Sequence, residues 1–265
     1  MKRYMKYFTT IILTFFLTGI SAQNDKVIEG DYQKRTYLSG DTALNYQIMY
    51  PNKFDKSKKY PLVLFLHGMG ERGTNNEKQM THGSKLFRDS IDEYPAIVIF
   101  PQCPPTDYWA NLYRPDEGGK DRIFEFHINE EPNPSLAAVI KICEEMTSEK
   151  YVDESRFYIS GLSMGGMGVW ELTWRLGDKI AASMPICGGG PPEKAIEMTA
   201  VPLWVFHGVK DDVVDPRMSI SMTKAVQQNG GNAKISLYPN ANHNSWDAAF
   251  AEPKFLTWMF SKVRD

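Results

Sequence analysis

The sequence contains few cysteines, and it shows no metal-binding motif. Only three cysteines occur among 265 residues, at Cys103, Cys143 and Cys187, and none lies in a paired spacing such as CxxC. We therefore expect them to be buried small apolar residues, while a disulfide between two of them stays open because export favours disulfides. Neither an HExxH motif nor a calcium-loop pattern is present, so we expect no metal site and no cofactor.

The chain also lacks an excess of charge, an internal repeat and a low-complexity linker. Its formal net charge is −2, with 30 Lys and Arg against 32 Asp and Glu. A balance of this kind gives no attraction to nucleic acid or to anionic membranes, so we expect a neutral substrate or one whose charge is screened. The sequence does not indicate an oligomeric state. A hydrophobic content of 42% is enough for one large core, and we expect a single domain.

The first 22 residues have the layout of a secretory signal peptide. Three basic residues among the first six precede an apolar run over residues 8–20, which Ser21 and Ala22 close. The run is shorter than the ~20 apolar residues that a membrane-spanning helix needs. We therefore expect cleavage after Ala22, a catalytic domain over residues 23–265, a secreted or periplasmic location, and no stable membrane association after cleavage.

Hydrophobic periodicity separates an alternating start from a longer part with buried strands. Residues 34–51 alternate on either side of residues 39–41, which is typical of an antiparallel hairpin. Beyond Tyr60 the apolar runs are short and nearly continuous, as in parallel strands that are buried on both faces. These runs are PLVLFLHG, AIVIFPQ, RFYISG, ASMPICG, PLWVFHG and AKISLYP.

Segments between these runs carry apolar residues at helical spacing. Helices are predicted to begin at Pro134, after Ser163, at Pro216 and at Pro253. This alternation predicts an α/β fold, a mostly parallel doubly wound sheet with antiparallel edge strands at the N-terminus and helices on both faces. The long irregular segment 104–134 usually carries function in a compact domain. The sequence leaves open whether it is a mobile lid.

A serine lies between two glycines where a predicted strand gives way to a predicted helix, in YISGLSMGGMGVW. A sharp turn of this kind exposes the serine oxygen, and it brings backbone atoms so close that side chains at Gly161 and Gly165 would clash. The short GxSxG pattern is weak alone and becomes informative in this context. We predict that Ser163 is a nucleophile, which then needs a base within hydrogen-bond reach.

Histidines and aspartates beyond the serine supply candidates for a base and an acid. His243 lies in a polar loop between the last strand and the last helix, where its imidazole could reach the nucleophile, so we predict that it is the base. His207 directly ends a buried strand, and we interpret it as structural. The loop after PLWVF offers Asp211, Asp212 and Asp215, and position alone does not separate Asp211 from Asp212.

Backbone amides on two turns are candidates for an oxyanion hole. The N–H of Met164, directly after the serine, is one predicted donor. The turn after PLVLFL, residues 67–70 with the sequence HGMG, should provide the second donor, and the N–H of Met69 is our candidate.

As a set, these motifs resemble the secreted α/β-hydrolase esterases that are grouped with polyhydroxybutyrate depolymerases and with feruloyl and acetylxylan esterases. Related sequences are labelled predicted peptidases or phospholipase/carboxylesterases. The resemblance runs from about Tyr60 to the C-terminus, through LFLHGMGERG, IFPQCP, VDESRFYISGLSMGGMGVWEL, PICGGG, FHGVKDDVVDP and NHNSWDAAF. It implies the α/β-hydrolase fold, the base at His243, and the acid at the fourth residue after the His of the HGxxD turn, which is Asp211.

The resemblance also implies a function. It suggests a secreted carboxylic-ester hydrolase that forms an acyl-enzyme and acts on small-molecule or oligosaccharide esters, such as feruloyl or acetyl esters of plant polysaccharide. Trp109 and Trp246 could stack on a sugar or phenolic ring. Some relatives carry an N-terminal immunoglobulin-like module; about forty residues before Tyr60 are too few for one. We expect no gating domain, and therefore prefer ester to amide hydrolysis. A serine peptidase and a non-catalytic binding protein remain alternatives.

Overall fold

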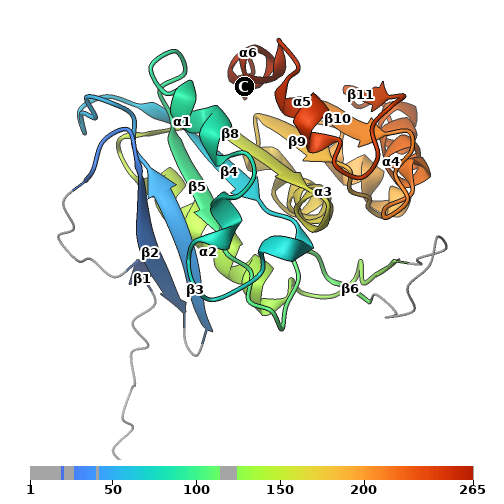
Figure 1. Ribbon diagram of the computed structural model, residues 1–265, viewed down its shortest axis with the longest axis horizontal. Coiled ribbons are helices and arrows are strands. Elements are labelled where there is room, and N and C mark those ends of the chain that lie inside the picture. Colours follow the sequence, from blue (N-terminus) through green and yellow to red (C-terminus); the bar gives the residue numbers. More distant parts are fainter. Residues whose placement is uncertain (1–18, 21–26, 40–41, 114–123, 265) are drawn as a thin grey trace, which may run out of the picture.

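The computed structural model of the chain describes residues 19–20, 27–39, 42–113 and 124–264. Apart from Gly19 and Ile20, the predicted signal peptide lies outside the described residues, as does the predicted turn at residues 40–41. A nine-stranded sheet crosses the molecule in the order β1-β2-β3-β5-β4-β8-β9-β10-β11 (Figure 1). Its strands are β1 (Gly19–Ile20), β2 (Tyr32–Ser39), β3 (Thr42–Met49), β4 (Tyr60–Leu66), β5 (Ile97–Pro101), β8 (Val152–Leu162), β9 (Ala182–Ile186), β10 (Leu203–Gly208) and β11 (Ala233–Tyr238).

The pairing of neighbouring strands changes once across this sheet, from antiparallel to parallel. The pairs β1–β2, β2–β3 and β3–β5 are antiparallel, and every pair from β5 to β11 is parallel. The expected hairpin is confirmed, because β2 and β3 pair from Tyr32 opposite Met49 to Ser39 opposite Thr42. The prediction of a mostly parallel sheet with antiparallel strands at its N-terminal edge is therefore confirmed.

The apolar runs of the sequence form the central strands. Every residue of β4, β5, β9 and β10 is buried. The run AKISLYP is the exception, because β11 lies at the edge of the sheet and only its first residue, Ala233, is buried. The expectation that this strand is buried on both faces is wrong.

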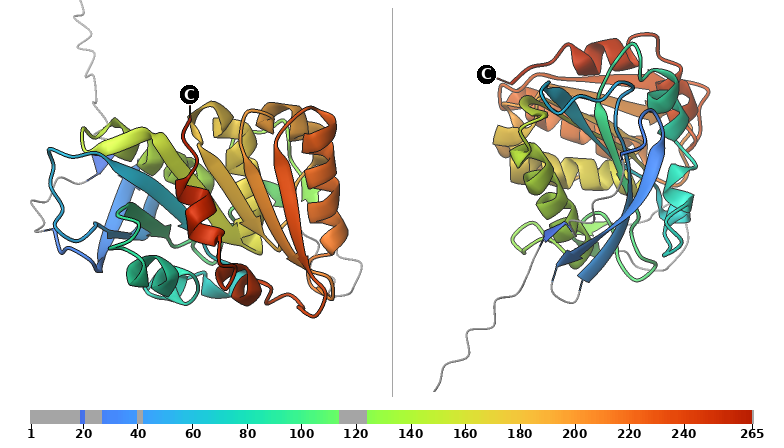
Figure 2. Two further views of the ribbon diagram at one scale, coloured as in Figure 1. Left: turned by 90° about the horizontal axis from the view of Figure 1, so that it is seen from above. Right: turned by 90° about the vertical axis from the view of Figure 1, so that its left-hand side faces the viewer.

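Helices cover both faces of the sheet, as predicted for a doubly wound fold (Figure 2). Alternate residues of β4 point to opposite faces, so Leu62, Leu64 and Leu66 pack with α2 and α3, whereas Val63 and Phe65 pack with α1, α5 and α6. Helix α4 joins α3 on the first face through Met222. The α-helices are α1 (Ser84–Asp89), α2 (Pro134–Ser148), α3 (Met164–Leu176), α4 (Pro216–Gln228), α5 (Trp246–Phe250) and α6 (Phe255–Phe260), and the short 3₁₀ helices are η1 (Met69–Glu71), η2 (Lys78–Met80), η3 (Gly177–Lys179) and η4 (Pro192–Met198).

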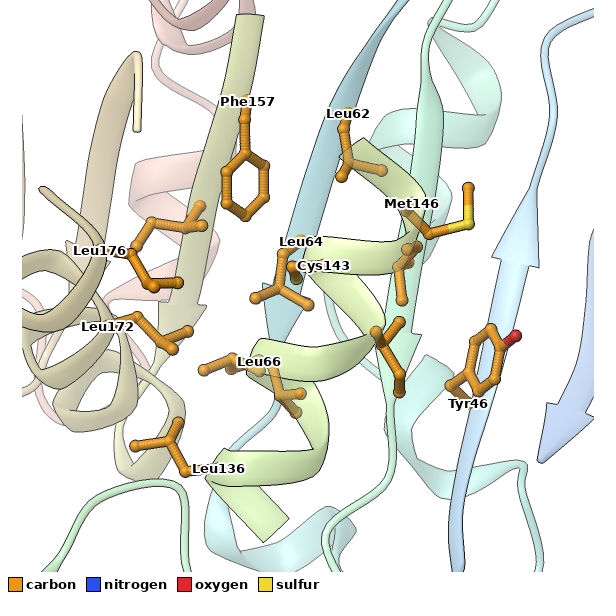
Figure 3. Close-up of a cluster of buried hydrophobic side chains, with 14 of the residues drawn as sticks. Tyr46, Leu62, Leu64, Leu66, Leu136, Cys143, Met146, Phe157, Leu172 and Leu176 are labelled. Atoms are coloured by element: carbon orange, nitrogen blue, oxygen red, sulfur yellow. The ribbon is translucent and has the colours of Figure 1, made fainter. Parts of the chain in front are cut away.

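Local sequence explains where the long helices begin. Asn133 and Asp215 cap α2 and α4 by accepting a hydrogen bond from a backbone N–H of the first turn, and proline follows each cap as the first helical residue. The last helix begins at Phe255, two residues after the predicted start. In the core, the side chains of α2 and α3 lie over β4 and β8 (Figure 3), which holds the carboxyl ends of those strands in place.

The three cysteines are buried, as expected from their spacing. All three are described by the structure, and none of them forms a disulfide with another. Within the described ranges, no helix combines the length and the apolar character needed to cross a membrane.

Candidate active site

Ser163 occupies a sharp turn between β8 and α3 with a positive φ of 55° and a ψ of −116°. Neighbouring backbone explains the flanking glycines: a Cβ on Gly161 would lie 2.7 Å from the carbonyl oxygen of Leu66, and one on Gly165 would lie 2.0 Å from the same atom. The Ser163 N–H donates to the Ile186 carbonyl at 2.9 Å. The turn is thus pressed against the end of β4 and fixed to the end of β9, which presents the serine at the carboxyl edge of the sheet.

Two further predicted side chains meet Ser163 at this edge. Ser163 Oγ lies 2.9 Å from Nε2 of His243, and Nδ1 of His243 lies 2.8 Å from Oδ2 of Asp211. The loop that carries His243 can approach because Gly208 ends β10: a Cβ there would lie 2.3 Å from the Asn242 carbonyl oxygen. Residues that are 80 and 32 positions apart in the chain therefore form one continuous series of hydrogen bonds.

The carboxyl group of Asp211 is buried and fully hydrogen-bonded. Its Oδ1 accepts the N–H groups of Val213 and Val214, each at 2.9 Å, and Oδ2 lies near His243 and also 3.1 Å from Nε2 of His207. Burial would raise the pKa of Asp211, but the hydrogen bonds from the histidines and from Val214 outweigh it and hold that pKa well below its usual range. The group is therefore an ionised carboxylate.

The other two aspartates of this loop have different positions. The backbone N–H of Asp212 donates to the Asn242 side chain, and Asp212 is exposed. Asp215 caps α4 and pairs with Arg217. The geometry thus separates Asp211 from Asp212, which position in the sequence alone could not do.

Backbone from the 67–70 turn lies beside the serine. A Cβ on Gly68 would be 3.7 Å from Cβ of Ser163, so the backbone of Gly68 lies close to the serine. Met69, whose amide is the predicted donor, is the next residue and the first of η1. Met164 is the first residue of α3, where N–H groups have no partner within the helix. His67 contributes no side chain to the site: it is buried and accepts the Cys103 N–H at Nε2.

Cys187 is a neighbour of this site that the sequence did not single out. Its Sγ and ligand atoms of Asp211 and His243 lie within 4.8 Å of one another. Burial, with a further contribution from the Asp211 charge, raises the pKa of the Cys187 thiol, so the sulfur is protonated. A neutral thiol and a carboxylate already engaged by four donors do not suit a metal ion. The sequence feature that could have indicated this position of Cys187 is the motif PICGGG at the end of a buried strand.

The two predicted substrate-binding tryptophans differ in exposure. Trp109 has 0% of its surface exposed and packs edge-on against His67, with ring centroids 5.2 Å apart. Its burial contradicts the expectation that it stacks on a sugar or phenolic ring. Trp246 is partly exposed and lies edge-to-face with the His243 imidazole at 5.6 Å, beside the reactive groups.

Two hollows open near the carboxyl edge of the sheet. One, of about 640 Å³, lies between Phe126, Pro191 and Met218. The other, of about 380 Å³, lies between Met69, Tyr108 and other residues of the 104–134 segment. Between them stands a small hairpin of β6 (Leu112–Tyr113) and β7 (Glu125–Phe126).

The described ends of the 104–134 segment are tied to the helices beneath them. The Asn111 N–H donates to the buried carboxylate of Glu171 on α3 at 2.7 Å, and Arg175 pairs with the same carboxylate at 2.9 Å. Burial raises the pKa of Glu171. At the other end, Asn133 donates to the carbonyls of Tyr108 and Ala110. These contacts fix residues 108–111 against α3 and the start of α2.

Comparison with known proteins gives esterases and peptidases. The bifunctional acetylxylan esterase/xylanase XynS20E of Neocallimastix patriciarum is 28% identical over 58% of this chain, and Dipeptidyl-peptidase 5 of Porphyromonas gingivalis is 24% identical over 83%. The chain spans only 20% and 36% of the length of these two proteins. The Probable feruloyl esterase C of Aspergillus terreus is 25% identical, covering 84% of this chain and 75% of its own.

A solved structure and a family model agree with the fold. The structure of a thermostable esterase matches with a TM-score of 0.78 and 32% identity, over 88% of this chain and 64% of the esterase. The model of the Phospholipase/Carboxylesterase family matches residues 53–256, which include every residue of the serine–histidine–aspartate contact series. The chain has the α/β-hydrolase fold that the sequence predicted, and it belongs to the phospholipase/carboxylesterase family.

Proposed function

We propose that the protein is a serine carboxylic-ester hydrolase that works through an acyl-enzyme. The observation that carries the proposal is the series of hydrogen bonds from Ser163 through His243 to Asp211, at 2.9 and 2.8 Å. These distances allow proton transfer between the groups without rearrangement.

Each group then has one task. His243 takes the proton of Ser163 as its oxygen attacks the ester carbonyl, and Asp211 stabilises the resulting imidazolium. The amides of Met69 and Met164 are the proposed donors to the oxyanion. The imidazolium returns its proton to the departing alcohol, and water, activated by the same histidine, releases the acid and restores the serine.

Geometry favours Ser163 over Cys187 as the nucleophile. Nε2 of His243 faces the serine oxygen, whereas Nδ1 is engaged by Asp211. The buried thiol stays protonated at neutral pH, because burial raises its pKa, and a protonated thiol is a poor nucleophile.

For the substrate we propose short acyl esters or feruloyl and acetyl esters of plant polysaccharide. The names of two relatives, an acetylxylan esterase/xylanase and a feruloyl esterase, support this class. Trp246 beside His243 and the two hollows at the same edge offer room for an acyl group and an alcohol.

We further propose that the protein acts after export, in the periplasm or outside the cell. The basic start and apolar run of the first 22 residues support this location. One relative, from Arthroderma benhamiae, is named a secreted protein.

Initial rates on a matched set of substrates test the proposal. The set comprises p-nitrophenyl acetate, p-nitrophenyl butyrate, methyl ferulate, acetylated xylan and a peptide anilide. Ester turnover should fall by at least ~10⁴-fold in Ser163→Ala. Cys187→Ala is the matched control, since it removes the other candidate nucleophile at the same edge, and its rate should stay within about tenfold of the wild type.

Two results would contradict the proposal. Cleavage of the anilide alone would assign a serine peptidase. Absence of all turnover, together with no labelling by a fluorophosphonate probe, would assign a binding protein. Good turnover of simple esters with none of ferulate or acetylxylan would contradict only the polysaccharide substrate.

A further inference from the structure

Behind the Asp211 carboxylate lies a second histidine that has no part in the proposed chemistry. His207 is the next-to-last residue of β10 and is fully buried. Nε2 contacts the Asp211 carboxylate and the Val214 carbonyl oxygen, and Nδ1 contacts the Ser219 hydroxyl, which in turn donates to the Gly188 carbonyl. Buried polar atoms are almost always hydrogen-bonded, so the protons of this group can be assigned by counting donors and acceptors.

Nε2 of His207 must carry a proton. It lies 3.1 Å from the ionised Asp211 oxygen and 3.0 Å from the Val214 carbonyl oxygen. Both neighbours are acceptors only, and a bare nitrogen between them would face two lone-pair-bearing oxygens without a hydrogen.

Nδ1 of His207 must carry a proton as well. It lies 2.7 Å from Ser219 Oγ, and that same oxygen lies 2.7 Å from the Gly188 carbonyl oxygen. A hydroxyl has one proton, and the carbonyl can only accept, so the serine donates to Gly188. The remaining contact is satisfied only if Nδ1–H donates to the serine oxygen.

We propose that His207 is an imidazolium ion that serves as a positively charged positioning residue behind Asp211. The same counting applied to His67, which is also buried, gives a neutral ring. There Nδ1 lies 2.6 Å from the Gly68 carbonyl and donates, and Nε2 accepts the Cys103 N–H at 3.0 Å. Burial lowers the pKa of His67 to about 4, which agrees with a neutral ring.

The inference rests on the proposed function for its consequence. Four titratable groups face this region: Asp211 and His243 in the reactive series, Cys187 at the end of β9, and Asp215 at the start of α4. His207 and His243 both contact Oδ2 of the carboxylate. The charge of His207 also disfavours a second positive charge on His243, which accepts the serine proton only in its neutral form.

Nitrogen-15 NMR of the histidine rings in the wild-type protein tests the charge directly. We expect His207 to show protons on both ring nitrogens from pH 6 to pH 9. The chain has five histidines, so the signal can be assigned by its loss in His207→Gln, or by elimination with the other four if that variant does not fold. A bare nitrogen on His207 within this range would overturn the proposal.

The pH profile of kcat/KM tests the consequence. Gln at position 207 can still donate to Asp211 but is neutral, so the acid limb should move upward by about one pH unit, which is roughly a tenfold loss of rate below the limb. A purely structural role would lower the rate equally at every pH and leave the limb in place, and this would overturn the proposal. If the NMR result holds while Ser163→Ala retains ester turnover, the proposed function fails and the charge assignment stands.

Discussion

Replacing Gly165 with alanine should separate the serine turn from the end of β4. The added Cβ would lie 2.0 Å from the Leu66 carbonyl oxygen and 2.7 Å from that of His67. Real Cβ atoms essentially never come within 3.0 Å of such a neighbour, so the backbones must part by about 1 Å. Both neighbours are backbone atoms that cannot rotate away. The shift falls between Ser163 and the proposed Met69 amide, and a displacement of this size can cost ~10²-fold in rate.

The assay is kcat/KM on p-nitrophenyl acetate, with urea unfolding in parallel. We expect a loss of at least ~10²-fold for Gly165→Ala and a destabilisation of about 1–3 kcal/mol. Gly70→Ala is the matched control: it lies in the same pair of turns, a Cβ there meets nothing within 4 Å, and its rate should stay within about threefold of the wild type. Full activity in Gly165→Ala would refute the reasoning from close backbone approach.

Substitutions at Ser163, Asp211 and Arg175 test the strain, the charge and the ion pair in and beneath the site. Ser163→Gly should abolish ester turnover yet raise stability by about 1 kcal/mol and Tm by ~2–4 °C, because glycine adopts the positive φ without strain; an unchanged or lower Tm would contradict this. Asp211→Asn should lower kcat by ~10⁴-fold through the wrong imidazole tautomer, whereas exposed Asp212→Asn should not, and equal losses would refute the assignment. Arg175→Met removes the positively charged partner of the buried Glu171 carboxylate and should lower the free energy of unfolding in urea by about 3 kcal/mol; an unchanged free energy of unfolding would contradict this.

The fold was predictable because its central strands and helix starts carry local signals. The runs PLVLFL and PLWVF indicate strands buried on both faces, and they form β4 and β10. AKISLYP has the same local appearance but forms the exposed edge strand β11. Which of two similar strands lies at an edge depends on the order of strands in the sheet, and no local pattern contains that order.

The contacts of the site were predictable to different degrees. GxSxG between a strand and a helix, a histidine in the last loop and aspartates after β10 are short-range signals, and Ser163, His243 and Asp211 do meet. The charge that we propose for His207 was not predictable, because the argument at Nδ1 needs Ser219 and Gly188, which come from two other parts of the chain. A histidine at a strand end is ordinarily structural, and only the network gives it a charge.

The sequence contained a signal that Trp109 is buried rather than free to stack on a substrate ring. Gly168 is the third glycine of GGMG and lies inside α3, where glycine costs about 1 kcal/mol relative to alanine. A Cβ at this position would lie 2.6 Å from Cβ of Trp109 and 2.7 Å from its carbonyl oxygen, so the helix tolerates the cost because another segment packs directly on its backbone. An interior helix glycine next to a serine turn therefore indicates a neighbouring segment in close contact. In this chain that segment carries Trp109, which packs on the backbone of α3 at Gly168 and on the His67 ring.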